Sequence, residues 1–198
     1  MNPTIDLSNV TLRTERLILR PWELSDLDDF YEYARVDGVG QMAGWLPHKD
    51  IEETLRILNS FIEGKKTFAL EYNEKVIGSL EVKKYNQEEL PEFESFACRE
   101  IGYVLSKDYW GLGLMPEAVN EVIRFLFEEI GLDVIFCSYF VRNSQSARVQ
   151  EKCGFHFYKQ VVHTTQFGTE EITNRNLLRR EDWEEELRTK QGRYTENS

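Results

Sequence analysis

The sequence has few cysteines and histidines, and no long apolar run. Its three cysteines, Cys98, Cys137 and Cys153, are far apart and form no Cys-x-x-Cys pair. The three histidines show no metal-ligand spacing, so neither a disulfide framework nor a metal site is indicated. No apolar segment reaches the roughly 18 residues that cross a membrane, and the N-terminus has no apolar run of the kind found in signal peptides. We therefore expect a cytoplasmic protein that does not associate with a membrane.

Basic residues are also in deficit. The 24 Lys and Arg residues face 35 Asp and Glu residues, which gives a formal net charge of −11 at pH 7. An acidic surface argues against nucleic acid as a partner and is compatible with a cationic substrate. The length of 198 residues suffices for one sizeable core and is short for two. We expect a single domain over 1–198, with its core in residues 11–183 and a peripheral tail over 184–198.

Hydrophobic periodicity predicts a mixed α/β domain (α+β) without internal repeats or linkers. Strands are predicted at 11–20, 67–72, 75–82, 96–105, 134–141, 155–165 and 170–178. A first helix is predicted to begin at Ser25, and further helices at 50–64, 116–130 and 144–152, followed by an acidic helical tail. Ser25 and Asp50 are the expected N-caps of the first two helices. The nearly continuous apolar run 134–141 is typical of a central strand buried on both faces. The glycine-rich segment 36–49, with an exposed-looking Trp45, is either the wall of a site or an ordinary loop.

A glycine-rich turn lies between the predicted strand 96–105 and the next helix, in the stretch YWGLGLMPEAV. A helix start carries unsatisfied amides and a partial positive charge, so the amides of residues 112–115 can hold a pyrophosphate without a basic side chain. The Gly-Lys-Ser/Thr of a P-loop is absent, and Pro116 occupies the place of the third glycine of a dinucleotide-binding fingerprint. A helix-start turn with no ligand remains open.

Three stretches together resemble the GNAT N-acetyltransferase superfamily, in particular the branch that contains ribosomal-protein N-terminal acetyltransferases. They are TERLILRPWELSD, REIGYVLSKDYWGLGLMPEAV and NSQSARVQEKCGF, and the resemblance extends from about Leu12 to Trp183. It implies a mostly antiparallel, twisted mixed sheet that is splayed between its fourth and fifth strands and flanked by helices. It also implies acetyl-CoA as the cosubstrate.

The resemblance assigns the cofactor-binding residues. It implies a pyrophosphate turn of Trp110, Gly111, Leu112, Gly113, Leu114 and Met115, a strand end that pairs with the pantetheine arm (Tyr103, Val104, Leu105), and a cofactor contact by Asn143. Trp110 and Met115 depart from the general pattern of the superfamily. Each assignment has a structural alternative, since Asn143 also suits an N-cap and Tyr103 suits a core position.

Direct transfer requires a base for the amine, a donor for the oxyanion and a partner for the leaving thiolate. The resemblance implies Glu100 as the candidate base, because it lies on the strand beside the thioester, where several family members carry a glutamate that works through water. Strand alternation places Gly102 on the same face, which leaves room beside Glu100. Glu81 is the reserve. A free amide at a bulge near Val104 would bind the oxyanion.

The leaving thiolate needs a partner of its own. Gln150 stands where many relatives carry a tyrosine acid, so Ser146 becomes the thiolate partner, with Tyr139 and Tyr158 as weaker alternatives.

The expected function is acetyl transfer from acetyl-CoA to a primary amine in a ternary complex. The acceptor is either a protein N-terminal α-amine or a small-molecule amine, and the protein is a monomer or a homodimer. The alternative is a non-catalytic acetyl-CoA-binding or interaction module on a degenerate GNAT fold. Retention of Glu100, Asn143 and Ser146 favours the enzyme.

Overall fold

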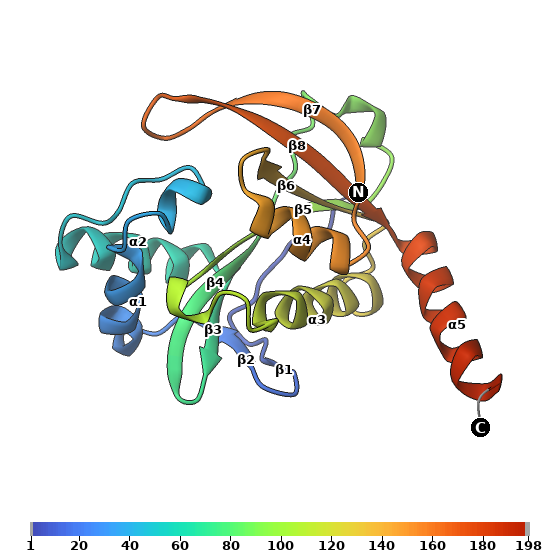
Figure 1. Cartoon of the computed structure of the whole chain (residues 1–198), viewed down its shortest axis with the longest axis horizontal. Helices are drawn as coiled ribbons and strands as arrows, with labels where there is room; N and C mark the ends of the chain where they lie inside the picture. The colour runs from blue at the N-terminus through green and yellow to red at the C-terminus, as the bar shows by residue number, and fades with distance from the viewer. Residues whose placement is uncertain (1, 197–198) are drawn as a thin grey trace.

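The computed structural model describes residues 2–196, with side chains described up to residue 189 (Figure 1). It is built on one eight-stranded sheet with the order β1-β2-β3-β4-β5-β6-β8-β7. The strands are β1 (Leu12–Arg13), β2 (Ile18–Pro21), β3 (Thr67–Tyr72), β4 (Lys75–Lys83), β5 (Cys98–Leu105), β6 (Val134–Phe140), β7 (His156–Thr164) and β8 (Glu170–Arg179). Only β5 and β6 pair in parallel, so the predicted mixed, mostly antiparallel sheet is confirmed.

Five α-helices flank the sheet. They are α1 (Leu27–Ala34), α2 (Ile51–Gly64), α3 (Leu114–Glu128), α4 (Ser144–Lys152) and α5 (Arg180–Glu196). The apolar face of α3 packs on one side of the sheet, and α1 and α2 pack on the other. Helix α5 projects from the end of β8, and its Trp183 ring contacts Phe127 of α3 at a centroid distance of 5.3 Å. Of the expected peripheral tail, residues 197 and 198 lie outside the described part. No described helix has the length and hydropathy that a membrane crossing requires.

The prediction of one strand over 11–20 is wrong, because the segment folds back on itself as β1 and β2 with Leu12 opposite Leu19. The hydroxyl of Thr14 accepts a hydrogen bond from the Leu17 amide at 2.9 Å and closes the turn. Leu12 and Leu17 are both buried although five positions separate them. A single extended strand would have placed them on opposite faces.

Ser25 is not the N-cap of the first helix. A 3-10 helix, Leu24–Asp26, precedes α1, and its capping box joins Glu23 and Asp26. Asp26 is buried and accepts two hydrogen bonds from the guanidinium of Arg20, at 2.8 and 2.9 Å. This charged contact fixes Asp26 at the N-cap position of α1, where it makes no side-chain capping hydrogen bond to that helix. Asp50, by contrast, caps α2 as predicted, with its carboxylate 2.8 Å from the Glu53 amide.

The predicted splay lies between β5 and β6. Cys98–Ile101 pair with Val134–Cys137, and the pairing ends there although β5 continues to Leu105 and β6 to Phe140. The parallel strands therefore share four residue pairs and then diverge. The backbone edges beyond this point border an opening in the sheet.

A close approach of β4 to β5 requires glycine at position 78. Gly78 lies opposite Leu105, and a Cβ at that position would overlap the carbonyl oxygen of Val104. Gly102, on β5, has nothing within 4 Å of the position that a Cβ would occupy.

We expect Gly78→Ala to lower the free energy of unfolding by about 1–3 kcal/mol, because the strands must shift to admit the methyl group. The matched variant Gly102→Ala places the same methyl group in open space and should cost less. Urea unfolding followed by circular dichroism measures both. Equal midpoints for the two variants would contradict the close approach.

Candidate active site

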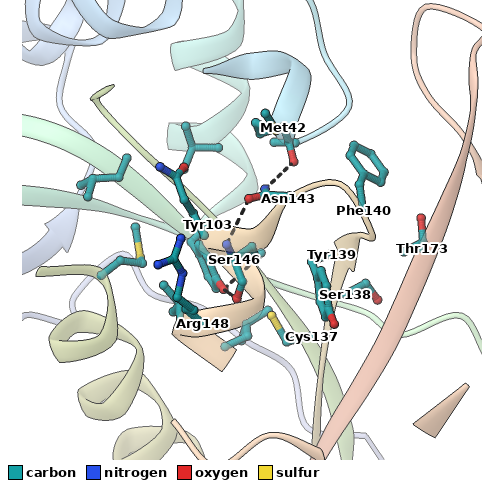
Figure 2. Close-up of a pocket in the computed structure, with 18 of the residues that line it drawn as sticks. Met42, Tyr103, Cys137, Ser138, Tyr139, Phe140, Asn143, Ser146, Arg148 and Thr173 are labelled. Carbon is teal, nitrogen blue, oxygen red and sulfur yellow. Dashed lines mark hydrogen bonds between the residues drawn. The ribbon is translucent and has the colours of Figure 1, made fainter. Parts of the chain in front are cut away.

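A cavity of about 620 Å³ passes through the opening between β5 and β6. Residues from both faces of the sheet line it. Tyr103, Met115 and Ser146 belong to the α3 and α4 side, whereas Glu100, Ser138 and Arg175 belong to the opposite side. Figure 2 shows part of this lining, with Tyr103 and Ser146 together on one side of it. One cavity can therefore admit two molecules from opposite faces of the sheet.

The glycine turn borders the α3 end of the cavity. Gly111 and Gly113 have φ values of 81° and 79°, in the left-handed region that favours glycine. Gly113 is the N-cap of α3 and has no side chain that could accept a capping hydrogen bond. The amides of Leu114 and Met115, the first two residues of the helix, therefore receive no side-chain cap from it. Unpaired amides at a helix start suit an anion. Of the six turn residues predicted from the sequence, all but Leu112 line the cavity.

Trp110 connects this turn to the splayed strand. Its indole Nε1 donates a hydrogen bond to the carbonyl oxygen of Leu105 at 2.9 Å. The bond spans the connection between β5 and α3 and fixes the turn beside the strand end. The departure from the family pattern at this position therefore has a structural role.

Thr14 and Arg16 lie beside the turn, and the sequence had not indicated them. The carboxylate of Glu117, in the first turn of α3, accepts from the Thr14 hydroxyl at 2.5 Å and from the Arg16 side chain at 2.7 Å. Arg16 also donates to the carbonyl of Leu112 at 3.0 Å. Burial alone would raise the pKa of Glu117, but the hydrogen bonds from Thr14 and Arg16 outweigh it and lower that pKa. A carboxylate is thus held beside the glycine turn together with a compensating cation.

The predicted bulge near Val104 is not found, because the β4–β5 register runs without a shift from Gly78 opposite Leu105 to Lys83 opposite Glu100. The Ser106 amide donates to the Ile77 carbonyl at 2.7 Å. Hydrogen bonds alternate in direction along an antiparallel pair, so the Val104 amide also faces β4. The amides of Tyr103 and Leu105 then face the opening. The splay, and not a bulge, leaves them available.

Tyr103 reaches Ser146 across the opening. Their hydroxyl oxygens are 3.0 Å apart (Figure 2). Gln150 Nε2 donates to the Ser146 hydroxyl at 3.3 Å. Burial is the largest cause of a pKa for Tyr103 well above its ordinary value, so the phenol stays protonated. Gln150, at the position where the resemblance implied a tyrosine in many relatives, thus holds the Ser146 hydroxyl by a hydrogen bond. The sequence predicted that the backbone of Tyr103 pairs with the cofactor, but it did not indicate the contact between the Tyr103 hydroxyl and Ser146.

Asn143 is the N-cap of α4, since its Oδ1 accepts from the Ser146 amide at 3.0 Å. Its Nδ2 donates to the carbonyl of Met42 at 3.3 Å (Figure 2). Both polar atoms of the Asn143 side chain thus form hydrogen bonds within the protein, and these bonds join α4 to the segment 36–49.

The segment 36–49 lines the cavity through Val39, Met42 and Ala43. Trp45 is not the exposed residue that the sequence suggested, since it is partly buried against Gly40 and His48.

Glu100 lines the cavity on the face opposite Tyr103. Its side chain is 12% exposed, and one carboxylate oxygen lies 3.7 Å from the Lys83 Nζ. Open space over Gly102 adjoins it. Glu81, the reserve candidate, lies outside the lining and forms an ion pair with Lys66 at 2.8 Å.

The two weaker tyrosine candidates differ in position. Tyr139 lines the cavity, and its hydroxyl accepts a hydrogen bond from Asn174 at 2.9 Å. Tyr158 lies outside the lining and donates its hydroxyl hydrogen to Glu92. Among the described residues, no group of three or more His, Cys, Asp or Glu side chains is arranged to hold a metal ion.

The family model of the GNAT acetyltransferase domain matches residues 16–156. The chain belongs to the GNAT acetyltransferase family. It is an N-acetyltransferase that uses acetyl-CoA. The N-acetyltransferase p20 of Bacillus licheniformis is 28% identical over 152 residues, which are 73% of this chain and 82% of that protein.

Two solved structures share the fold. The ribosomal-protein-S5-alanine acetyltransferase of Vibrio fischeri has a TM-score of 0.67 at 23% identity, covering 88% of this chain and 99% of its own. The spermidine N-acetyltransferase of Vibrio cholerae, solved with CoA and spermine, has a TM-score of 0.68 at 19% identity, covering 85% and 98%. One carries the name of a protein substrate and the other that of a polyamine, so the shared fold leaves the acceptor undecided.

We expect Arg16→Gln to weaken CoA binding by roughly tenfold, because Glu117 would then present an uncompensated charge to the phosphates. Arg13→Gln removes an equal charge from the same hairpin and serves as the control. The double variant Arg16→Gln/Glu117→Gln should recover part of the affinity, which titration calorimetry measures. Wild-type affinity in Arg16→Gln would show that the Arg16–Glu117 pair only stabilises the fold.

Proposed function

We propose that this acetyltransferase moves the acetyl group directly from acetyl-CoA to a primary amine, with the two substrates entering from opposite faces of the sheet. The main support for this proposal is that a single cavity passes through the opening between β5 and β6 and is lined by residues of both faces of the sheet. On one face it meets the helix-start amides and the Tyr103–Ser146 hydroxyl pair, and on the other it meets Glu100. Both reactants can therefore meet at the opening without a covalent enzyme intermediate.

The residues at the α3 end fit acetyl-CoA. The amides of Leu114 and Met115 suit the pyrophosphate, since they belong to a helix start that lacks a capping side chain. The edge of β5 beyond Ile101 is free of β6 and can pair with the amide groups of the pantetheine arm, as an added strand would. Asn143 supports this end indirectly, by fixing the first turn of α4.

Glu100 is the proposed base. A primary amine is protonated near neutral pH, and it must lose a proton before its nitrogen can attack the thioester carbonyl. Glu100 borders the open space over Gly102, where a water molecule could carry that proton to the carboxylate. Lys83 offsets part of the buried charge of Glu100.

Attack forms the new C–N bond and places negative charge on the carbonyl oxygen. The amides of Tyr103 and Leu105, which face the opening, are the proposed donors to this oxygen. The attacking nitrogen loses its extra proton to water, collapse of the intermediate breaks the C–S bond, and the thiolate leaves. Ser146 donates the hydrogen bond or proton that stabilises it, and Tyr103 and Gln150 orient the Ser146 hydroxyl.

We expect Glu100→Gln to lower kcat/KM on the order of a hundredfold near neutral pH, as is typical when a general base is removed. The loss should shrink as the pH rises, because more of the amine is then already neutral. Glu81→Gln is the matched control, since that carboxylate lies outside the cavity. Thiol release from acetyl-CoA with an amine panel measures both variants. A Glu100→Gln enzyme with wild-type activity at every pH would remove Glu100 from the mechanism.

Ser146→Ala should lower kcat by roughly ten- to a hundredfold and leave acetyl-CoA affinity nearly unchanged. The hydrogen bond strengthens as the sulfur gains charge, and such bonds to charged groups contribute about 1.5–3 kcal/mol. Tyr103→Phe, which keeps the ring, should have the smaller effect. If Tyr103→Phe is the more damaging change, the phenol and not the serine assists the thiolate.

The same thiol-release assay separates an enzyme from a non-catalytic acetyl-CoA-binding module. CoA binding without thiol release, across protein N-terminal peptides, amino acids and polyamines, would favour the module.

A further inference from the structure

Two buried hydrogen-bond donors without partners lie together at the acceptor end of the cavity. Arg175 of β8 pairs with Ser138 of β6 in the sheet register, and both residues line the cavity. Within the described part of the chain, Arg175 Nε and the Ser138 hydroxyl are buried and make no hydrogen bond. A buried donor without a hydrogen-bond partner is energetically unfavourable. Two such donors side by side are suited to a ligand that brings acceptor oxygens.

The charge of Arg175 is only partly compensated. The residue is 8% exposed, and its Nη1 forms an ion pair with Glu89 at 2.8 Å. The Glu89 side chain is 48% exposed and belongs to the connection between β4 and β5. A guanidinium presents several donors in a planar fork, so it can keep this pair and still bind a second oxyanion.

Arg175 lies on the same face as the proposed base. Glu100 is opposite Phe136 in the register, Phe136 and Ser138 share a face of β6, and Ser138 is opposite Arg175. Glu100 and Arg175 are thus two strand spacings apart and offset by two residues along the strands, about 12 Å between their backbones, on either side of the opening. That separation suits a small acceptor with its amine toward Glu100, through water, and an anionic group toward Arg175.

We propose that Arg175, with Ser138, binds a carboxylate of the acceptor, and that the acceptor is a small zwitterionic amine such as an amino acid or a short peptide. This inference rests on the proposed acetyl transfer and adds the class of acceptor to it. Arg175 contacts substrate away from the reacting atoms, so it determines specificity and does not take part in the chemical step.

Matched acceptor pairs test the proposal. Each pair consists of an amino acid and its amide, for example glycine with glycinamide, which share the amine and differ in the carboxylate. The amine of the amide loses its proton more easily, so intrinsic reactivity favours the amide. We expect the wild-type enzyme to prefer the acid by at least tenfold in kcat/KM. Wild-type turnover of the amide, or of an N-terminal peptide amide, as good as that of the acid overturns the proposal.

The variants assign the preference to Arg175. Arg175→Gln should abolish it through a higher KM for the acid, with the amide as the internal control for folding, and Arg175→Lys should retain part of it. Lys159→Gln is the matched control, since Lys159 donates to the Glu89 carbonyl at 2.6 Å but does not line the cavity. A preference for the acid that survives in Arg175→Gln also overturns the proposal.

A binding measurement separates this inference from the proposed function. N-acetylglycine and N-acetylglycinamide, the corresponding products, are titrated into the CoA complex of the wild type and of Arg175→Gln. Tighter binding of the acid that depends on Arg175 supports the carboxylate site even if no amine is acetylated, an outcome that would refute transfer alone. Equal binding of both products to the wild type overturns the carboxylate site even if transfer occurs.

Discussion

The short parallel pairing of β5 with β6 is the constraint on which the site depends. Four residue pairs hold the two strands together, and beyond them the strands diverge while each remains in the sheet through its other neighbour, β4 or β8. A paired edge would have occupied the β5 amides and closed the cavity. The break gives one strand two functions, since its buried half stabilises the core and its free half borders the site.

Several contacts fix the segments around this break. Trp110 joins the glycine turn to the end of β5, and Asn143 joins α4 to the segment 36–49. The Arg16–Glu117 pair holds the first turn of α3 against the β1–β2 hairpin. Each contact joins two different segments of the chain, and the Asn143 contact also spans the opening. Together they preorganise a cavity that no single element could enclose.

The charges of the cavity differ from the charge of the whole chain. The net charge of −11 suggested an attraction for cations, but Lys83 balances Glu100 and Arg175 balances Glu89 at the acceptor end. Electrostatic interactions between close, buried groups exceed those with distant, solvent-screened ones. Recognition of the acceptor therefore depends on these pairs more than on the acidic surface.

The sequence alone predicted the mixed sheet, the amphipathic α3, the N-cap of α2, the splay and the glycine turn, because local periodicity, turn chemistry and a family resemblance determine them. It also predicted the alternation that separates Glu100 from Tyr103 on β5. It failed where a residue outside the element decides the outcome: Arg20 of β2 holds Asp26 at the start of α1, and Arg16 reaches the glycine turn from about 100 positions away. The Tyr103–Ser146 contact and the position of Arg175 beside Ser138 likewise arise only when separate elements meet. Hydrogen bonds and ion pairs act over a few ångströms in space, so only the tertiary structure decides which residues form them.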